Sequence, residues 1–226
     1  MAKRGNIRGS RWATIIIVIV VIAMAGSTLP FFLGNFISGA RKSGDLTPDA
    51  FKQSIQEVKE QLEQQAKQLE DYIDEYGPTE ATLANLAGIY YQLINYQDIL
   101  DPEKTPPYQE KLLQTYQDLV ELAPDNLEYR FNMVLAYQGV EKEEEARAEA
   151  EALMEVLEPR LEENPDNRER YYYAVLLGEF EDDPEAALEI LNVILETEHE
   201  GSGVYNSAGR YKDELEARLK EQEDKN

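Results

Sequence analysis

The sequence predicts an all-α protein in which an N-terminal transmembrane helix is followed by a solenoid of about three helical-hairpin repeats, with a flanking helix at each end. Three observations predict this fold class. An uncharged apolar run occupies residues 13–33, apolar residues recur every three or four positions over 47–76, and APDN at 123–126 returns as NPDN at 164–167. The first is typical of a membrane span, and the other two indicate amphipathic and repeated helices.

The net charge is strongly negative and unevenly distributed. The chain has 226 residues, no cysteine, one histidine and a formal net charge of −23. Residues 1–42 hold six basic side chains and no acid, so the remainder carries 16 basic against 45 acidic groups. Nucleic-acid binding needs a basic face, and the sequence shows none. Adaptation to a high-salt habitat would give the same acidic composition. We expect no metal site and no cofactor, because cysteine is lacking and histidine is single.

The first expected element is the membrane span. As a helix, residues 13–33 are long enough to cross a hydrocarbon core of about 30 Å. Four basic residues precede the run and two follow it, which favours a cytoplasmic N-terminus and an extracytoplasmic C-terminal domain of a single-pass cell-membrane protein. The alternative is a cleaved signal peptide, since Ala23-Met24-Ala25 has the small-x-small pattern. We assign a basic tail (1–12), a transmembrane signal-anchor (13–37) and a linker (38–46).

A long amphipathic helix is expected over residues 47–77. Thr47 suits its N-cap and Pro48 its first position, and Gly77-Pro78 ends it. A narrow apolar seam, interrupted at Gln65, consists of Phe51, Ile55, Val58, Leu62, Leu69, Tyr72 and Tyr76. The seam either pairs with a second copy as a coiled coil, giving a homo-oligomer, or packs on the repeats that follow. The coiled-coil hypothesis requires Leu62 and Leu69 to be exposed in the monomer.

The two PDN segments mark an internal repeat. When they are aligned, Phe131 meets Tyr172, Leu135 meets Leu176 and Ala146 meets Ala187, all 41 residues apart. Each half then reads as a helix, a short turn and a second helix. Units that repeat on this scale bury their apolar faces by stacking on one another.

These units resemble the tetratricopeptide repeat (TPR) family, in which two antiparallel helices repeat about every 34 residues. LANLAGIYYQ at 83–92 matches the family's first helix, with Leu86-Ala87 and Tyr90 in place, and Tyr116 and Pro124 match the second. The first repeat contains an insertion, predicted as a loop over 94–107, and the second is long around Pro159. The resemblance implies repeats at 80–126, 127–167 and 168–201 and a capping helix at 202–226. Gly178 stands where the family usually has tyrosine.

Recognisable catalytic motifs are missing from the sequence. It contains no nucleophile elbow, no Gly-rich phosphate loop and no metal-ligand cluster, and His199 stands alone in a polar segment. Within the 94–107 insertion, Asp98, Asp101 and Glu103 are the candidate catalytic groups, without a fixed pairing. We therefore do not expect an enzyme.

The TPR resemblance implies a concave groove that holds a peptide or a partner helix. The positions that would line this protein-binding groove are Tyr91, Phe131, Leu135, Gln138, Tyr172 and Leu176. The carboxylate clamp of some family members is absent, because Ala84, Glu169 and Tyr173 replace its basic residues. Alternatively, Phe131 and Tyr172 are core. Since residues 171–173 cannot share one helical face, at least one of these tyrosines is expected in the core.

Two functional hypotheses follow. In the first, the chain is a membrane-anchored adaptor or scaffold that recruits an unidentified protein partner on the extracytoplasmic side, in envelope assembly, secretion or cytochrome maturation. It requires a solvent-open groove over Phe131, Leu135, Tyr172 and Leu176. In the second, residues 47–76 form a coiled coil, and the chain is an oligomeric structural scaffold of the envelope.

Overall fold

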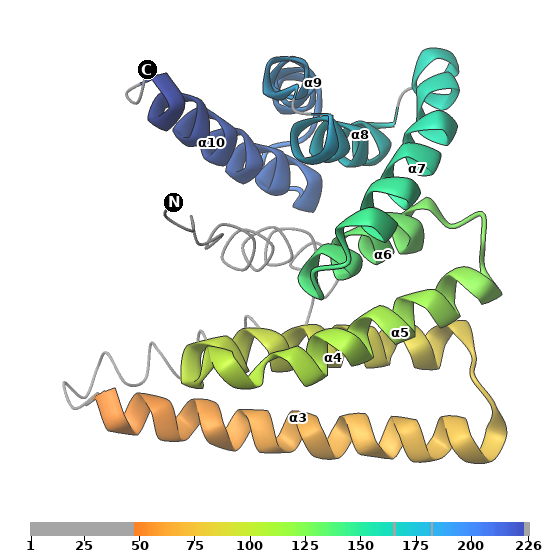
Figure 1. Ribbon diagram of the computed structural model, residues 1–226, viewed down its shortest axis with the longest axis vertical. Coiled ribbons are helices and arrows are strands. Elements are labelled where there is room, and N and C mark those ends of the chain that lie inside the picture. The colour runs from red at the N-terminus through yellow and green to blue at the C-terminus, as the bar shows by residue number, and fades with distance from the viewer. Residues whose placement is uncertain (1–47, 165, 182, 224–226) are drawn as a thin grey trace, which may run out of the picture. The chain divides into compact units, whose positions relative to one another are not determined.

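The computed structural model describes residues 48–164, 166–181 and 183–223 (Figure 1). The all-α class is confirmed over this range, which contains eight α-helices, one short 3₁₀ helix and no strand. The described residues divide into two compact units, one ending at Asp125 and the other beginning at Asn126. Each unit has its own helices and buried residues and is described by itself.

The predicted membrane segment lies outside the described residues. The basic tail at 1–12, the signal-anchor at 13–37, the linker at 38–46 and the N-cap Thr47 all fall outside the described residues. Within the part of the chain that the structure describes, no helix has both the length and the apolar character needed to cross a membrane.

The first unit consists of three α-helices and a short 3₁₀ helix. It contains α3 (Pro48–Tyr76), α4 (Glu80–Leu100), the 3₁₀ helix η1 (Pro102–Lys104) and α5 (Pro106–Leu122), and α4 packs on both α3 and α5 (Figure 1). The bounds of α3 agree with the predicted long helix. Helix α3 ends where Gly77 takes a φ of 87°, a conformation that favours glycine, and Thr79 then caps α4.

The predicted loop at 94–107 is wrong. Helix α4 continues to Leu100 and η1 follows it, so only Asp101 and Thr105 lie outside a helix in this stretch. The loop was predicted from the extra length of the first repeat, but Ile94 and Tyr96 are buried, and this burial outweighs the weak helix propensity of the Asn and Asp residues there. Asp98 accepts a hydrogen bond of 2.5 Å from Thr105, and Asp101 pairs with Lys104.

The apolar seam of α3 packs inside the first unit at its centre. Ile55 and Leu62 are buried, together with Ala66, whereas Tyr72 and Tyr76 are exposed. Because Leu62 is only 6% exposed, the expectation that it is free in the monomer is wrong. Leu69 is half-buried. Leu62 is therefore not available to a coiled-coil partner in this arrangement.

Two glutamates on α3 hold the three helices of the first unit together. Glu70 accepts hydrogen bonds from Tyr90 of α4 and, at 2.6 Å, from Lys111 of α5. Two turns earlier on α3, Glu63 accepts a hydrogen bond of 2.8 Å from Lys59 and another from Tyr108 of α5. Burial by itself would raise the pKa of Glu70, but the hydrogen bonds from Lys111 and Tyr90 outweigh it and lower the pKa below its usual range.

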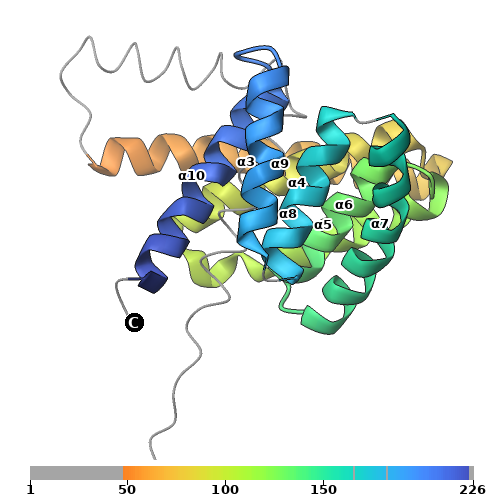
Figure 2. The same cartoon turned by 90° about the horizontal axis from the view of Figure 1, so that it is seen from above.

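The second unit consists of five helices packed in succession. They are α6 (Leu127–Gly139), α7 (Glu143–Glu163), α8 (Asn167–Phe180), α9 (Pro184–Thr197) and α10 (Gly203–Glu223). Helix α7 packs on α6 and α8, α9 packs on α8, and α10 packs on α9 and α8 (Figure 2). The fully buried side chains come from every helix of the unit and include Phe131, Leu153, Leu157, Leu176, Leu191, Ile194 and Tyr211.

The 41-residue register holds in the core but slips by one residue at the helix starts. Phe131 stacks on Tyr172, its equivalent in the next hairpin, with ring centroids 4.4 Å apart. The N-cap of α6 is Asn126, which accepts from two backbone amides, whereas the N-cap of α8 is Asp166. Asn167, aligned with Asn126, is the first residue of α8 and instead donates to Thr197 and Glu198 at the end of α9.

Gly178 accommodates a tyrosine from another helix. Tyr211 of α10 is fully buried against Gly178, and its hydroxyl donates a 2.8 Å hydrogen bond to Glu179. Arg218 of α10 donates to the same carboxylate at 2.5 Å. The family pattern would place a tyrosine on α8 here. In this chain α10 supplies the aromatic ring, and glycine leaves room for it.

Candidate protein-binding groove

The six predicted groove residues lie in two different units and are mostly buried. Phe131 is 0% exposed, Leu135, Tyr172 and Leu176 are also buried in the second unit, and Gln138 is half-buried. Tyr91 is buried in the first unit. Phe131 also meets the edge of Tyr171, with ring centroids 6.4 Å apart. The expected solvent-open groove over Phe131, Leu135, Tyr172 and Leu176 is therefore wrong, and these side chains are core.

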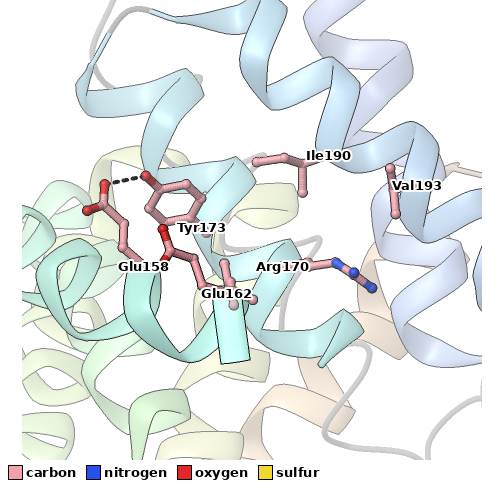
Figure 3. Close-up of a pocket in the computed structure, with 7 residues that line it drawn as sticks. Glu158, Glu162, Arg170, Tyr173, Ile190 and Val193 are labelled. Carbon is pink, nitrogen blue, oxygen red and sulfur yellow. Dashed lines mark hydrogen bonds between the residues drawn. The ribbon is translucent and has the colours of Figure 1, made fainter. Parts of the chain in front are cut away.

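A different groove opens among the helices of the second unit. It has a volume of about 570 Å³, is open to solvent, and lies between α7, α8 and α9 (Figure 3). This volume falls within the roughly 300–1,000 Å³ of ordinary ligand sites. We call it the α7–α9 groove; its lining residues are Glu158, Leu161, Glu162, Arg170, Tyr173, Ile190 and Val193.

The C-terminal part of α7 forms one wall of the groove. Helix α7 has 21 residues, against 14 each for α8 and α9, and it makes few contacts with α9. The buried stripe of α7 ends at Leu157. The part of α7 beyond Leu157 supplies Glu158, Leu161 and Glu162 to the groove lining.

Hydrogen bonds fix the polar side chains around the groove. The Tyr173 hydroxyl donates to Glu158 Oε1 at 2.6 Å, which joins α8 to α7 (Figure 3). Burial, reinforced by this hydrogen bond, raises the pKa of Tyr173 above its ordinary value, so the phenol remains a donor at neutral pH. Arg170 donates to Asn167 at 2.8 Å. Among the described residues, Glu162 has no hydrogen-bond or ion-pair partner.

The two walls of the groove are acidic. Helix α7 carries nine glutamates against two arginines, and α9 carries three glutamates and no basic residue. Both arginines of α7 are engaged: Arg147 donates to the Phe180 carbonyl at 2.7 Å, and Arg160 pairs with Glu169 at 2.5 Å. The groove lining itself holds two carboxylates, Glu158 and Glu162, and one cation, Arg170, so negative charge is in excess there by one.

The sequence did not predict this groove, although it contains two features that are related to it. The three consecutive tyrosines divide as helical geometry requires, with Tyr171 and Tyr172 buried and Tyr173 partly exposed. The unusual length of the second repeat around Pro159 was also visible. What the sequence could not give was the position of the α7 extension beside α9, which depends on how the hairpins pack.

Comparison with known proteins does not assign the chain to a family. No family model, curated protein or solved structure matches it. The TPR resemblance therefore rests on the residues of this chain alone. Within the described part of the chain, no group of three or more His, Asp or Glu side chains is placed to hold a metal ion.

Proposed function

We propose that the chain is a membrane-anchored adaptor whose TPR-like helical hairpins hold a protein partner on the extracytoplasmic side of the membrane. The observation that carries the proposal is the open α7–α9 groove, with an apolar lining and acidic walls. The anchor is inferred from the uncharged run at 13–33 and its flanking basic residues. The processes in which we propose that it acts are envelope assembly, secretion or cytochrome maturation.

The TPR-like assignment is supported by contacts between equivalent positions of successive hairpins. Phe131 stacks on Tyr172, and Ala146 and Ala187 are both fully buried, in each case 41 residues apart. Such periodic burial is the mark of units that stack on their neighbours. The oligomeric coiled-coil alternative has less support, because Leu62 is buried within the first unit.

Attachment to a membrane also allows a groove of low intrinsic affinity to bind its partner. A tethered domain meets other membrane proteins at a high effective concentration, so contacts that are weak in free solution suffice for binding. The acidic surface repels anionic lipid headgroups and so leaves the domain free of the membrane surface.

The proposal is tested in cells that produce the full chain, with a photoreactive residue at Val193. Val193 lines the groove and is 39% exposed; the control position is the exposed Glu57 of α3. We expect the chain to stay in the membrane pellet after an alkaline carbonate wash, and external protease to digest the helical domain. We also expect a discrete heterologous adduct from Val193 that is absent from Glu57.

Three results would contradict the proposal. Release of the chain by carbonate would reject the anchor, and protection from external protease would reject the orientation. The absence of a Val193-specific adduct would reject the adaptor. An adduct of two copies of the chain at Glu57 would instead favour the oligomeric scaffold, which pairs copies through α3.

A further inference from the structure

We propose that the α7–α9 groove binds a cationic amphipathic segment of a protein partner, with apolar side chains in the groove and lysine or arginine against Glu158 and Glu162. This inference rests on the proposed adaptor function, since it names the class of partner for the same groove. Three features support it: the solvent-accessible apolar lining, the two wall carboxylates that have no paired cation, and the separation of the apolar and acidic surfaces.

The apolar lining is provided by Leu161, Ile190 and Val193. Val193 is one of two large hydrophobic side chains that remain exposed among the described residues of the second unit; the other, Val156, lies on α7. Ile190 and Val193 are three residues apart and share one face of α9, so they offer two adjacent contacts rather than one. A partner with more than one apolar side chain therefore fits this surface.

The acidic wall favours a cation. Glu158 and Glu162 are four residues apart on α7, where like charges repel one another and destabilise the helix. No cation is paired with them in the described chain: Glu158 accepts from the uncharged Tyr173 hydroxyl, and Arg170 donates to Asn167 with its guanidinium directed away from both carboxylates (Figure 3). A bound lysine or arginine would attract both carboxylates and offset their repulsion, whereas an anionic partner would add to the repulsion.

The arrangement of the two features favours an amphipathic segment over a small molecule. The carboxylates stand on α7 and the apolar pair stands on α9, with α8 between them, so the two kinds of surface form separate rows (Figure 3). A helix or extended peptide with one apolar and one basic edge presents the same two rows. Recognition of an amphipathic segment along a groove is a common mode of peptide binding.

The test uses the full chain in phosphatidylcholine nanodiscs and two synthetic fluorescent peptides of about 14 residues, long enough for several helical turns. Both peptides have leucine at the same positions; the polar positions are lysine in one and glutamate in the other. Binding is measured by fluorescence anisotropy at about 0.15 M salt, with empty nanodiscs as the blank. We expect the lysine peptide to bind, more weakly as salt rises, and the glutamate peptide not to bind.

Matched variants locate the binding site. Replacing both wall carboxylates, Glu158→Gln with Glu162→Gln, is expected to weaken the lysine peptide about fivefold to tenfold. The control, Glu144→Gln with Glu145→Gln, makes the same charge change about 20 Å away along α7 and is expected to leave the affinity within about twofold. Val193→Ser is expected to weaken binding about threefold through lost apolar contact.

Other outcomes would overturn this inference. Equal weakening by the two glutamate pairs would show unspecific attraction to an acidic protein, and equal binding of both peptides would show that charge is not read. Self-association that Val193→Ser abolishes would make a second copy the occupant. If neither peptide binds while Val193 still crosslinks to a partner in cells, the cationic segment is rejected and the adaptor is retained; if the crosslink is also absent, both proposals fail.

Discussion

Replacing Phe131 with alanine is expected to lower the free energy of unfolding of the second unit by about 3–5 kcal/mol. Phe131 is fully buried, stacks on Tyr172 and meets the edge of Tyr171, so its removal leaves a cavity among rigid aromatic rings. A groove residue would behave differently, because its side chain would already be in contact with water. The substitution therefore distinguishes core from binding surface.

The measurement is urea unfolding followed by far-UV circular dichroism, fitted with a separate transition for each unit because a chain with two units need not unfold in one step. The matched control is Tyr173→Ala, which removes a half-buried ring from the α7–α9 groove and is expected to cost about 1 kcal/mol. A smaller loss for Phe131→Ala than for Tyr173→Ala would contradict the burial of the aromatic cluster formed by Phe131, Tyr171 and Tyr172.

Gly178→Ala is expected to destabilise the second unit by about 1–2 kcal/mol, although alanine is the better helix former. A Cβ atom at residue 178 would overlap Tyr211 Oη and lie 3.3 Å from Leu215 Cδ2. Tyr211 cannot swing away freely, since it is fully buried and its hydroxyl is bonded to Glu179. Overpacking by about 1–3 kcal/mol then outweighs a gain in helix propensity of up to about 1 kcal/mol.

A second glycine gives a control of opposite sign. Gly88 lies within α4, and a Cβ atom there would meet nothing within 4 Å. Gly88→Ala should therefore stabilise the first unit by about 0.5–1 kcal/mol. Both variants are compared by thermal and urea unfolding. Adding Tyr211→Phe should relieve part of the loss from Gly178→Ala, and a stabilising effect of Gly178→Ala alone would contradict the packing of Tyr211 against α8.

Much of the helical layout could be predicted because it depends on local chemistry. Gly77 and Pro78 end the long helix regardless of its neighbours, so its predicted range of 47–77 differs little from Pro48–Tyr76. The 41-residue register was visible in Phe131 and Tyr172 because equivalent core positions keep their apolar character. Helix starts were less predictable, since either Asp166 or Asn167 has the chemistry of an N-cap.

The candidate site could not be predicted, because tertiary packing decides which apolar face is covered. A phenylalanine at 131 and a leucine at 176 are equally suited to a binding groove and to a core, so the sequence left both alternatives open. The loop expected over 94–107 failed for a related reason: burial of Ile94 and Tyr96 stabilises a helix that Asn and Asp alone would not favour. Predicting the α7–α9 groove requires knowing how α7 packs beside α8 and α9, which is a relation between two hairpins.

The central claim is that the second unit presents the α7–α9 groove to solvent and keeps Phe131, Tyr172 and Leu176 as core. Cysteine labelling tests it most directly, because the chain has no cysteine of its own and a single introduced thiol reports one position. The two variants are Val193→Cys and Leu176→Cys, treated with a maleimide under native conditions and again in urea. The structure predicts rapid native labelling at residue 193 and labelling at residue 176 only after unfolding. Native labelling at residue 176 as fast as at 193 would contradict the claim.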